Sequence, residues 1–227
     1  MTEEQAQHWL RTQGWLDSEA GERLRHLAAL VLEEADRQNL ISAGSRAQIW
    51  NRHIVDSAQL LALPALAGEP EGLWVDLGTG AGFPGLVIAC LRSQPMALVE
   101  VRPLRVAFLE RAARALGLDQ VTVIAGKVEK TVLPSPARII SARAYAPLDK
   151  LLASAHHLAD ENTVWLLPKG QNGEKELAIA RSKWQAVFHV EQSLTDPESV
   201  IITAQGVAPR IAPKRSFKAM NSRRNRR

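Results

Sequence analysis

The stretch that decides the fold is Leu73-Trp74-Val75-Asp76-Leu77-Gly78-Thr79-Gly80-Ala81-Gly82-Phe83-Pro84-Gly85. An apolar run ends in an acidic residue, and four glycines that alternate with small side chains follow. This pattern predicts a buried strand, a tight turn and the start of a helix. Glycine permits positive φ and the close approach of a ligand. Pro84 suits a first helical turn, where its missing N–H would have had no partner. We therefore expect a nucleotide-like ligand above this glycine loop (residues 78–85).

The charge beside the loop indicates which nucleotide it binds. Gly80, Gly82 and Gly85 also fit the dinucleotide spacing G-x-G-x-x-G, and Glu100 lies about the expected distance downstream. A dinucleotide would place its pyrophosphate at this helix N-terminus, where a neighbouring carboxylate repels it. Asp76 stands two residues before Gly78 and suits a ligand with an ammonium and a sulfonium group. The loop thus favours S-adenosylmethionine and a methyltransferase, with an NAD-dependent oxidoreductase as the open alternative.

Length and composition are those of an ordinary soluble protein. The 227 residues can hold one α/β domain and a smaller appendage. No apolar run approaches the roughly 20 residues of a membrane span, and the amino terminus lacks the order of a signal peptide. The single cysteine, Cys90, is expected to fill a small buried site. We expect a cytoplasmic protein with no membrane contact and no metal ion, and a monomer because no heptad pattern is sustained.

Positive charge is concentrated at the carboxyl end. The net charge is +4, yet residues 210–227 hold eight basic side chains and no acidic one, so the remainder is mildly acidic. We expect residues 208–227 to form a disordered tail because its apolar residues are too few to pack. Two interpretations stay open for this tail: an arm that binds phosphates without sequence choice, and a solvated terminus.

The periodicity divides the chain at about residue 70. Residues 1–70 are predicted to form a helical subdomain, with helices at 18–40 and about 45–63 that end at the Pro64 and Gly68–Pro70 breaks. Residues 71–207 alternate short apolar strands with helices, which predicts an α/β fold with a Rossmann-like, mostly parallel sheet. The expected strands are 73–77, 96–100, 121–125, 138–142 and 163–167, and the expected helices begin at 84, 103, 148 and 173. The last two strands, 186–191 and 200–204, have no helix between them and are expected to form an antiparallel hairpin at the sheet edge.

Residues that end the parallel strands are the candidates for ligand binding, because ligands bind at that edge of such a sheet. Glu100 ends the second strand, where it can accept from both ribose hydroxyls or serve as an acid near a helix start. Val128 and Glu129 follow the third strand, where they can cover an adenine face and bond its exocyclic amine. Without the glycine loop they would be taken for plain surface.

The fourth and fifth strands lead to candidate substrate contacts. Arg143 can fix a substrate through forked hydrogen bonds or stack on a base, and Tyr145 offers a second flat surface. Both can equally be structural, with Arg143 paired to a carboxylate. Lys169 is a candidate phosphate contact or an ordinary surface lysine. No side chain is predicted to act as an acid or base catalyst.

Several ordered motifs together resemble the bacterial RsmG family, also called GidB. They cover roughly residues 38–204 and comprise Asn39-Leu40-Ile41-Ser42, Arg52-His53-Ile54-Val55-Asp56-Ser57, Asp76 through Gly85, Val128-Glu129, Ser141-Ala142-Arg143-Ala144 and Lys169-Gly170. The resemblance implies a class I S-adenosylmethionine-dependent methyltransferase. Its implied target is guanine N7 in the 530 loop, in the region of position 527, of 16S ribosomal RNA.

The resemblance also implies roles for particular residues. The family's cofactor-binding positions are matched by Gly78, Phe83, Val128-Glu129 and Arg143. The predicted cofactor-binding set also includes Asp76, Gly80, Gly82 and Glu100. His53 and Asp56 match a family signature, and a structural hydrogen bond at the domain junction or an RNA contact is expected of them. Two departures are a glutamate at position 100, where many relatives carry aspartate, and a tail beyond the family's usual end.

The implied chemistry needs little from side chains. Guanine N7 carries a lone pair and no proton, so it can attack a methyl sulfonium directly without a general base. The protein's expected work is alignment and exclusion of water, with Asp76 and Glu129 holding the cofactor. The target base must be unstacked, which favours the small ribosomal subunit as substrate. A non-catalytic RNA-binding assembly factor that retains the cofactor pocket, and a small-molecule methyltransferase, remain alternatives.

Overall fold

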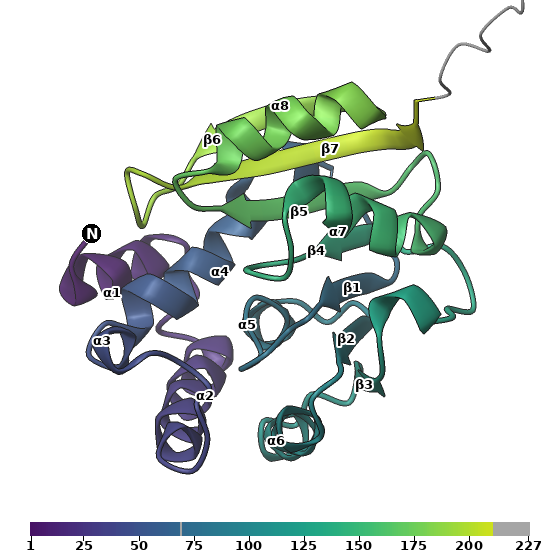
Figure 1. Ribbon diagram of the computed structural model, residues 1–227. Helices are drawn as coiled ribbons and strands as arrows, with labels where there is room; N and C mark the ends of the chain where they lie inside the picture. Colours follow the sequence, from purple (N-terminus) through teal and green to yellow (C-terminus); the bar gives the residue numbers. More distant parts are fainter. Residues whose placement is uncertain (69, 211–227) are drawn as a thin grey trace, which may run out of the picture.

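The computed structural model describes residues 1–68 and 70–210, so most of the predicted basic tail lies outside the described residues. A seven-stranded sheet with helices on both faces forms the centre of the molecule (Figure 1). Its strand order is β3-β2-β1-β4-β5-β7-β6. The strands are β1 (Trp74–Leu77), β2 (Met96–Glu100), β3 (Val121–Ala125), β4 (Ile139–Ser141), β5 (Val164–Lys169), β6 (Trp184–Gln192) and β7 (Val200–Pro209).

Strand directions confirm the predicted α/β class. The first five strands are parallel to one another, and β7 pairs antiparallel with both β5 and β6. The predicted hairpin therefore forms the sheet edge. It is longer than expected, because β6 begins at Trp184 and β7 continues to Pro209.

Alternate residues of the central strands enter different cores. Trp74 and Leu98 belong to a cluster with α2 (Glu19–Ala35), α5 (Gly85–Leu91) and α6 (Pro103–Ala115), whereas Val75, Leu77 and Val99 face α7 (Leu148–Ala155) and α8 (Gly173–Lys183). This is the period-two alternation of a strand. Both faces of the sheet are apolar and covered, as parallel sheets require.

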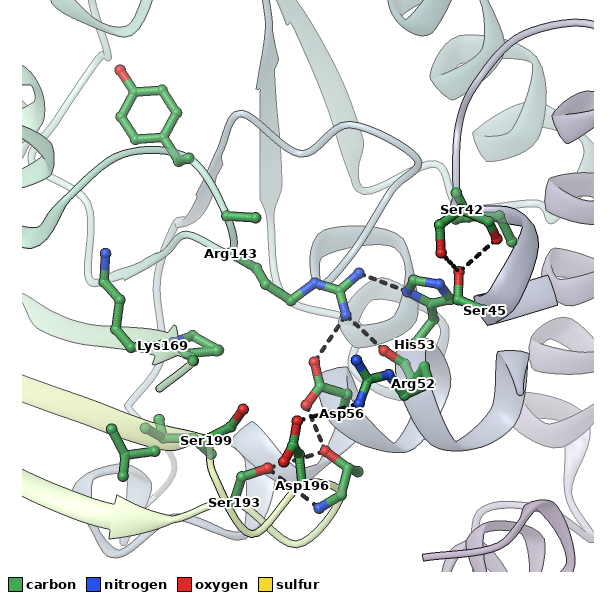
Figure 2. Close-up of a pocket in the computed structure, with 18 of the residues that line it drawn as sticks. Ser42, Ser45, Arg52, His53, Asp56, Arg143, Lys169, Ser193, Asp196 and Ser199 are labelled. Atoms are coloured by element: carbon green, nitrogen blue, oxygen red, sulfur yellow. Dashed lines mark hydrogen bonds and ion pairs between the residues drawn. The ribbon is translucent and has the colours of Figure 1, made fainter. Parts of the chain in front are cut away.

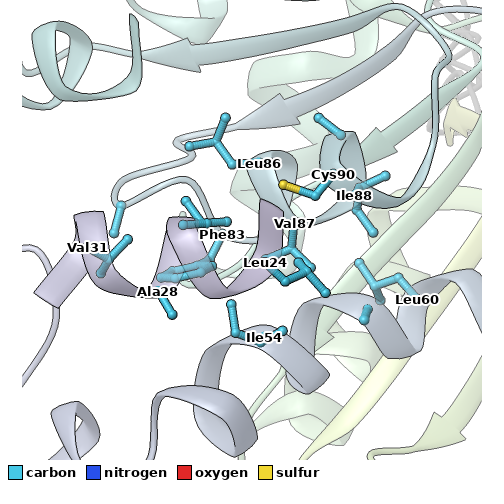
Figure 3. Packing of buried hydrophobic residues seen from close by; sticks show 14 of the residues in the cluster. Leu24, Ala28, Val31, Ile54, Leu60, Phe83, Leu86, Val87, Ile88 and Cys90 are labelled. Atoms are coloured by element: carbon cyan, nitrogen blue, oxygen red, sulfur yellow. The ribbon is translucent and has the colours of Figure 1, made fainter. Parts of the chain in front are cut away.

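The N-terminal helices share the first of these cores. Figure 3 shows Leu24, Ala28 and Val31 of α2 packed near Phe83 of the glycine loop and Val87 of α5. α1 (Glu3–Thr12) packs on the segment after α3 (Ala43–Arg46). No helix within residues 1–68 and 70–210 combines the length and the apolarity needed to cross a bilayer.

Two helix predictions for the N-terminal part need correction. The helix expected over residues 18–40 ends at Ala35. The single helix expected over 45–63 is wrong: α3 is followed by a π-helix (Trp50–Val55), α4 (Asp56–Ala58) and two 3₁₀ turns (Gln59–Ala62 and Pro64–Leu66). Part of the reason is tertiary, because the Trp50 and Asn51 N–H groups donate to the Glu3 carboxylate at 3.0 and 2.8 Å.

Candidate functional site

The glycine loop turns as its composition predicts. Gly78, Gly80 and Gly82 have φ of 63°, 60° and 93°, in the region that favours glycine. A Cβ at Gly78 would lie 2.6 Å from Cδ2 of Tyr145, so the aromatic ring closes directly on this backbone. The loop leads into α5, whose first residue is Gly85.

Asp76 supports the loop from beneath. Its carboxylate is fully buried and accepts from the Thr79 hydroxyl, from Ser141 Oγ at 2.7 Å and from the Gly85 N–H at 3.0 Å. Burial raises the pKa of this carboxyl to about 6, although the Thr79 and Ser141 hydrogen bonds oppose the shift. Asp76 therefore shapes the loop and ties β1 to β4, and its side chain has no exposed surface for a ligand.

Glu100 links the loop to the end of β2. Its Oε2 accepts from the Gly80 N–H at 3.0 Å, and its Oε1 accepts from the Val101 and Arg102 N–H groups at 2.8 and 2.9 Å. The residue is only 4% exposed, yet it lines a cleft at the carboxyl edge of the sheet. Both roles considered for this carboxylate, supporting the helix start and facing a ligand, are thus geometrically available.

This smaller cleft has a volume of about 370 Å³, within the usual size of small-ligand sites. Its lining includes Gly78 and Glu100, the predicted pair Val128 and Glu129, and Tyr145. The structure therefore brings together the residues expected to surround a nucleoside.

A larger cleft of about 730 Å³ lies beside it and is shown in Figure 2. Its walls come from residues 40–56, from the loop after β4, from the end of β5 and from residues 193–201 around the β6–β7 turn. The two clefts share Ala144 and Tyr145. Groups bound in the two clefts would therefore lie on either side of the short segment that follows β4.

Arg143 lines the larger cleft, and its guanidinium is directed to the N-terminal segment. Nη1 donates to Asp56 Oδ2 at 2.8 Å and to the Arg52 carbonyl at 2.9 Å, and Nη2 donates to His53 Nδ1 at 2.9 Å. The guanidinium carbon also lies 5.3 Å from the centre of the Phe83 ring. The structural alternative for Arg143, pairing with a carboxylate, is the arrangement observed.

His53 is held as a neutral ring. Because Arg143 donates to Nδ1, the remaining ring proton is on Nε2, which is buried and has no hydrogen-bond partner within the described residues. Burial, then the charges of Arg143 and Arg52, lower the pKa of His53 to about 3. The ring stacks on Phe83 with centroids 4.8 Å apart, and Phe83 is only 3% exposed. A structural hydrogen bond was one expectation for His53 and Asp56. In the structure both residues instead bond Arg143, which joins them.

Lys169 and Tyr145 also have internal partners. Lys169 Nζ lies 2.9 Å from Glu176 Oε2 and donates to the Ala146 carbonyl at 2.7 Å. Tyr145 donates its hydroxyl to Ser154 Oγ at 3.2 Å. Lys169 is therefore neither an ordinary surface lysine nor a free cation, although it lines the larger cleft.

The contribution of residues 193–201 to the larger cleft was not predictable from the sequence. Thr195 donates to Asp56 Oδ1 at 2.7 Å, and Arg52 Nη1 lies 3.2 Å from Asp196 Oδ2. Gln59 receives the Leu194 N–H at 2.8 Å. These partners lie more than 130 positions apart in the chain, so neither spacing nor a local motif reveals the contact.

Comparisons with known proteins agree with this geometry. The family model described as "GidB: rRNA small subunit methyltransferase G" matches residues 20–199. The "Ribosomal RNA small subunit methyltransferase G" of Novosphingobium aromaticivorans is 49% identical over 92% of this chain and 90% of its own. The protein of that name from Sphingopyxis alaskensis is 48% identical over 96% and 91%.

Among solved structures, the glycopeptide N-methyltransferase MtfA in complex with S-adenosyl-L-methionine aligns with a TM-score of 0.52 at 13% identity. It covers 66% of this chain and 93% of that one. This likeness shows the fold, which is that of class I S-adenosylmethionine-dependent methyltransferases. By its sequence and its fold, the chain belongs to the GidB family of ribosomal RNA small subunit methyltransferases.

Proposed function

We propose that this protein methylates N7 of a guanine in the 530 loop of 16S ribosomal RNA, with S-adenosylmethionine as the methyl donor. The observation that carries the proposal is the pair of clefts that share Ala144 and Tyr145 at the carboxyl edge of the sheet. The smaller has the size and lining suited to the cofactor, and the larger has room for an unstacked base. Family membership supplies the class of acceptor.

The residues of the smaller cleft fit the cofactor. Glu100 lies where its carboxylate would receive the ribose hydroxyls, and Val128 and Glu129 would contact the adenine. Gly78 lines this cleft without a side chain and has no room for a Cβ beside Tyr145, and Gly80 and Gly82, which do not line it, are proposed to act through the positive φ that shapes the turn. Asp76 and Phe83 are buried, so they are proposed to act by shaping this surface. Arg143 does not line this cleft and is proposed to act indirectly, by holding the loop after β4, whose Ala144 and Tyr145 do line it.

The proposed reaction matches a site without a free base. The bound cofactor supplies a methyl group that its sulfonium already activates. Guanine N7 has a lone pair and no proton to lose, and His53 is neutral with Nδ1 occupied by Arg143. The side chains therefore have to align the base with the methyl group and exclude water, and alignment alone can supply several kcal/mol of the barrier.

The small ribosomal subunit is the proposed substrate, and the protein is proposed to act in the cytoplasm as a monomer. Outside residues 210–227 the chain carries more acidic than basic side chains, so its body offers little charge for holding free RNA. Arg52, Arg143 and Lys169 of the larger cleft are each paired internally with a carboxylate. Recognition of a preformed RNA surface is consistent with this balance.

The proposal is tested on small subunits from a strain that lacks the endogenous modification. Subunits and protein-free 16S RNA are incubated with labelled S-adenosylmethionine, and the product is mapped by chemical cleavage at N7-methylguanine. Label at one guanine of the 530 loop, with subunits preferred over free RNA, is expected. Cofactor binding without label in any ribosomal RNA would contradict the proposal and favour an assembly factor.

A further inference from the structure

We propose that Asp56 is a positioning residue for methyl transfer: from its own segment it bonds two others that line the larger cleft, the loop after β4 and the β6–β7 turn, and through Arg143 it holds in place the segment that separates acceptor from cofactor. The inference rests on the proposed function, because it assigns the larger cleft to the acceptor base. Asp56 lies in α4 of the N-terminal part, and its role depends on what its two carboxylate oxygens hold.

The two oxygens bind opposite walls. Oδ2 accepts from Arg143 in the loop after β4 at 2.8 Å, and Oδ1 accepts from Thr195 in the β6–β7 turn at 2.7 Å. Gln59 reinforces the second contact, since its Nε2 reaches Asp56 Oδ1 at 3.1 Å and Ser193 Oγ at 3.3 Å. Figure 2 shows Asp56 between Arg143 and Ser193. Other contacts between these segments exist, among them Arg143 to the Arg52 carbonyl and the Leu194 N–H to Gln59, but Asp56 is the residue whose one side chain bonds both the loop after β4 and the β6–β7 turn.

The contact is shielded from water. The side chains of Asp56 and Arg143 are 18% and 19% exposed, so their attraction is less screened than that of a surface pair. The ring of His53 faces the same guanidinium. The other charges nearby, Arg52 and Asp196, are paired with each other at 3.2 Å. Asp56 is thus the carboxylate that balances the Arg143 charge.

The position of Arg143 bears directly on the place where transfer would occur. The next residue, Ala144, has φ of 53°, a backbone conformation that L-residues avoid and that surrounding contacts must maintain. Ala144 and Tyr145 line both clefts, and the Tyr145 ring lies against Gly78. A shift of about 1 Å in such a segment can slow an aligned reaction by roughly 100-fold. Asp56 can therefore govern transfer without touching either reactant.

The test is the Asp56→Asn variant, which keeps the shape of the side chain. It removes the charge that balances Arg143, and if its one oxygen still accepts from Arg143, its amide nitrogen faces Gln59 Nε2, a donor that it cannot satisfy. We expect kcat on small subunits to fall at least tenfold, while KM for subunits and Kd for S-adenosylhomocysteine each change less than about threefold. The Asp56→Asn/Arg143→Gln double variant should lose no more than the worse single variant, because both changes break the same connection.

A matched control breaks an ion pair outside both clefts. Asp149→Asn removes the negative charge that lies 2.6 Å from Lys183 between α7 and α8 and should leave kcat unchanged. Hydrogen exchange followed by mass spectrometry gives a readout that needs no activity. Residues 143–147 and 193–199 should exchange faster in Asp56→Asn than in the wild type, and at the wild-type rate in Asp149→Asn.

Three results would overturn the inference: wild-type kcat in Asp56→Asn, losses that multiply in the double variant, or unchanged exchange in both segments. If Asp56→Asn does not fold, Thr195→Val removes a single hydrogen bond of the carboxylate. It should lower kcat at least threefold and speed exchange in 193–199, and wild-type values for both would equally refute the role. Absence of methyl transfer by the wild type would contradict the proposed function instead. The exchange data would still decide whether Asp56 holds residues 143–147 and 193–199 together.

Discussion

Replacing His53 by asparagine should remove a defined part of the pH dependence of stability. Asparagine can place its oxygen near the position of Nδ1 and still accept from Arg143, but it does not titrate. The histidine is held neutral because burial and the charges of Arg143 and Arg52 lower its pKa to about 3. In the unfolded chain the ordinary value of 6.5 applies.

The sign and size of the effect follow from these two values. Between pH 6.5 and 3 the unfolded state binds a proton at His53 and the folded state does not, so acid favours unfolding. The contribution is fully present above pH 6.5 and is lost as the pH falls through this window. Each pH unit is worth about 1.4 kcal/mol, so the free energy of unfolding should fall by about 2 kcal/mol between pH 7 and pH 5 because of His53 alone.

Urea unfolding of the wild type and of His53→Asn at pH 7, 6 and 5 measures this difference. Other groups, including Asp76 with its raised pKa, titrate in both proteins and cancel in the comparison. The wild type should lose about 2 kcal/mol more than the variant over the range. Equal losses would show that His53 is accessible to protons in the folded protein and would refute its assignment as a buried neutral acceptor.

Three further predictions concern the loop, the strand-end carboxylate and the cysteine. Gly78→Ala should weaken S-adenosylhomocysteine binding at least tenfold in calorimetry, because the new Cβ would lie 2.6 Å from the Tyr145 ring at a φ of 63°; unchanged affinity would show that the ring moves freely. Glu100→Gln should weaken the same binding by roughly tenfold through loss of a charged acceptor, and an intact Kd would remove Glu100 from the ribose site. Cys90, whose pKa burial raises to about 12, should resist a water-soluble thiol reagent at pH 8 until denaturant is added, whereas prompt labelling would contradict its packing.

The sheet was predictable from sequence because its signals are local. Each strand is a short apolar run bounded by turn residues, and parallel strands covered on both faces need no further pattern. Most residues that line the smaller cleft were predictable for the same reason. Within the described chain, every residue that lines it lies between Gly78 and Tyr145, and all but Arg105 of α6 lie at or just beyond the ends of predicted strands. Topology alone then brings Glu100 and Val128 beside the glycine loop.

The N-terminal helices and the orientation of single carboxylates were not predictable in this way. Residues 45–63 have an amphipathic pattern, but Glu3 takes two of their N–H groups and the stretch divides into shorter pieces. Asp76 was expected to face the cofactor because it precedes the loop. In the structure the Asp76 carboxylate is buried and accepts hydrogen bonds from the Ser141 and Thr79 hydroxyls and from the Gly85 N–H. Such choices depend on partners that approach only after folding.

The two clefts are lined by residues from different parts of the sequence, which indicates that they have different roles. The smaller cleft, which we propose binds the cofactor, is lined mainly by loops at the carboxyl edge of the sheet. The larger cleft adds residues 40–56 and 193–201, which are far apart in sequence and meet at Asp56. Acceptor choice should accordingly reside in these added walls. Substitutions there should change kcat on the ribosomal substrate far more than cofactor affinity, and the reverse should hold for Glu100 and Gly78.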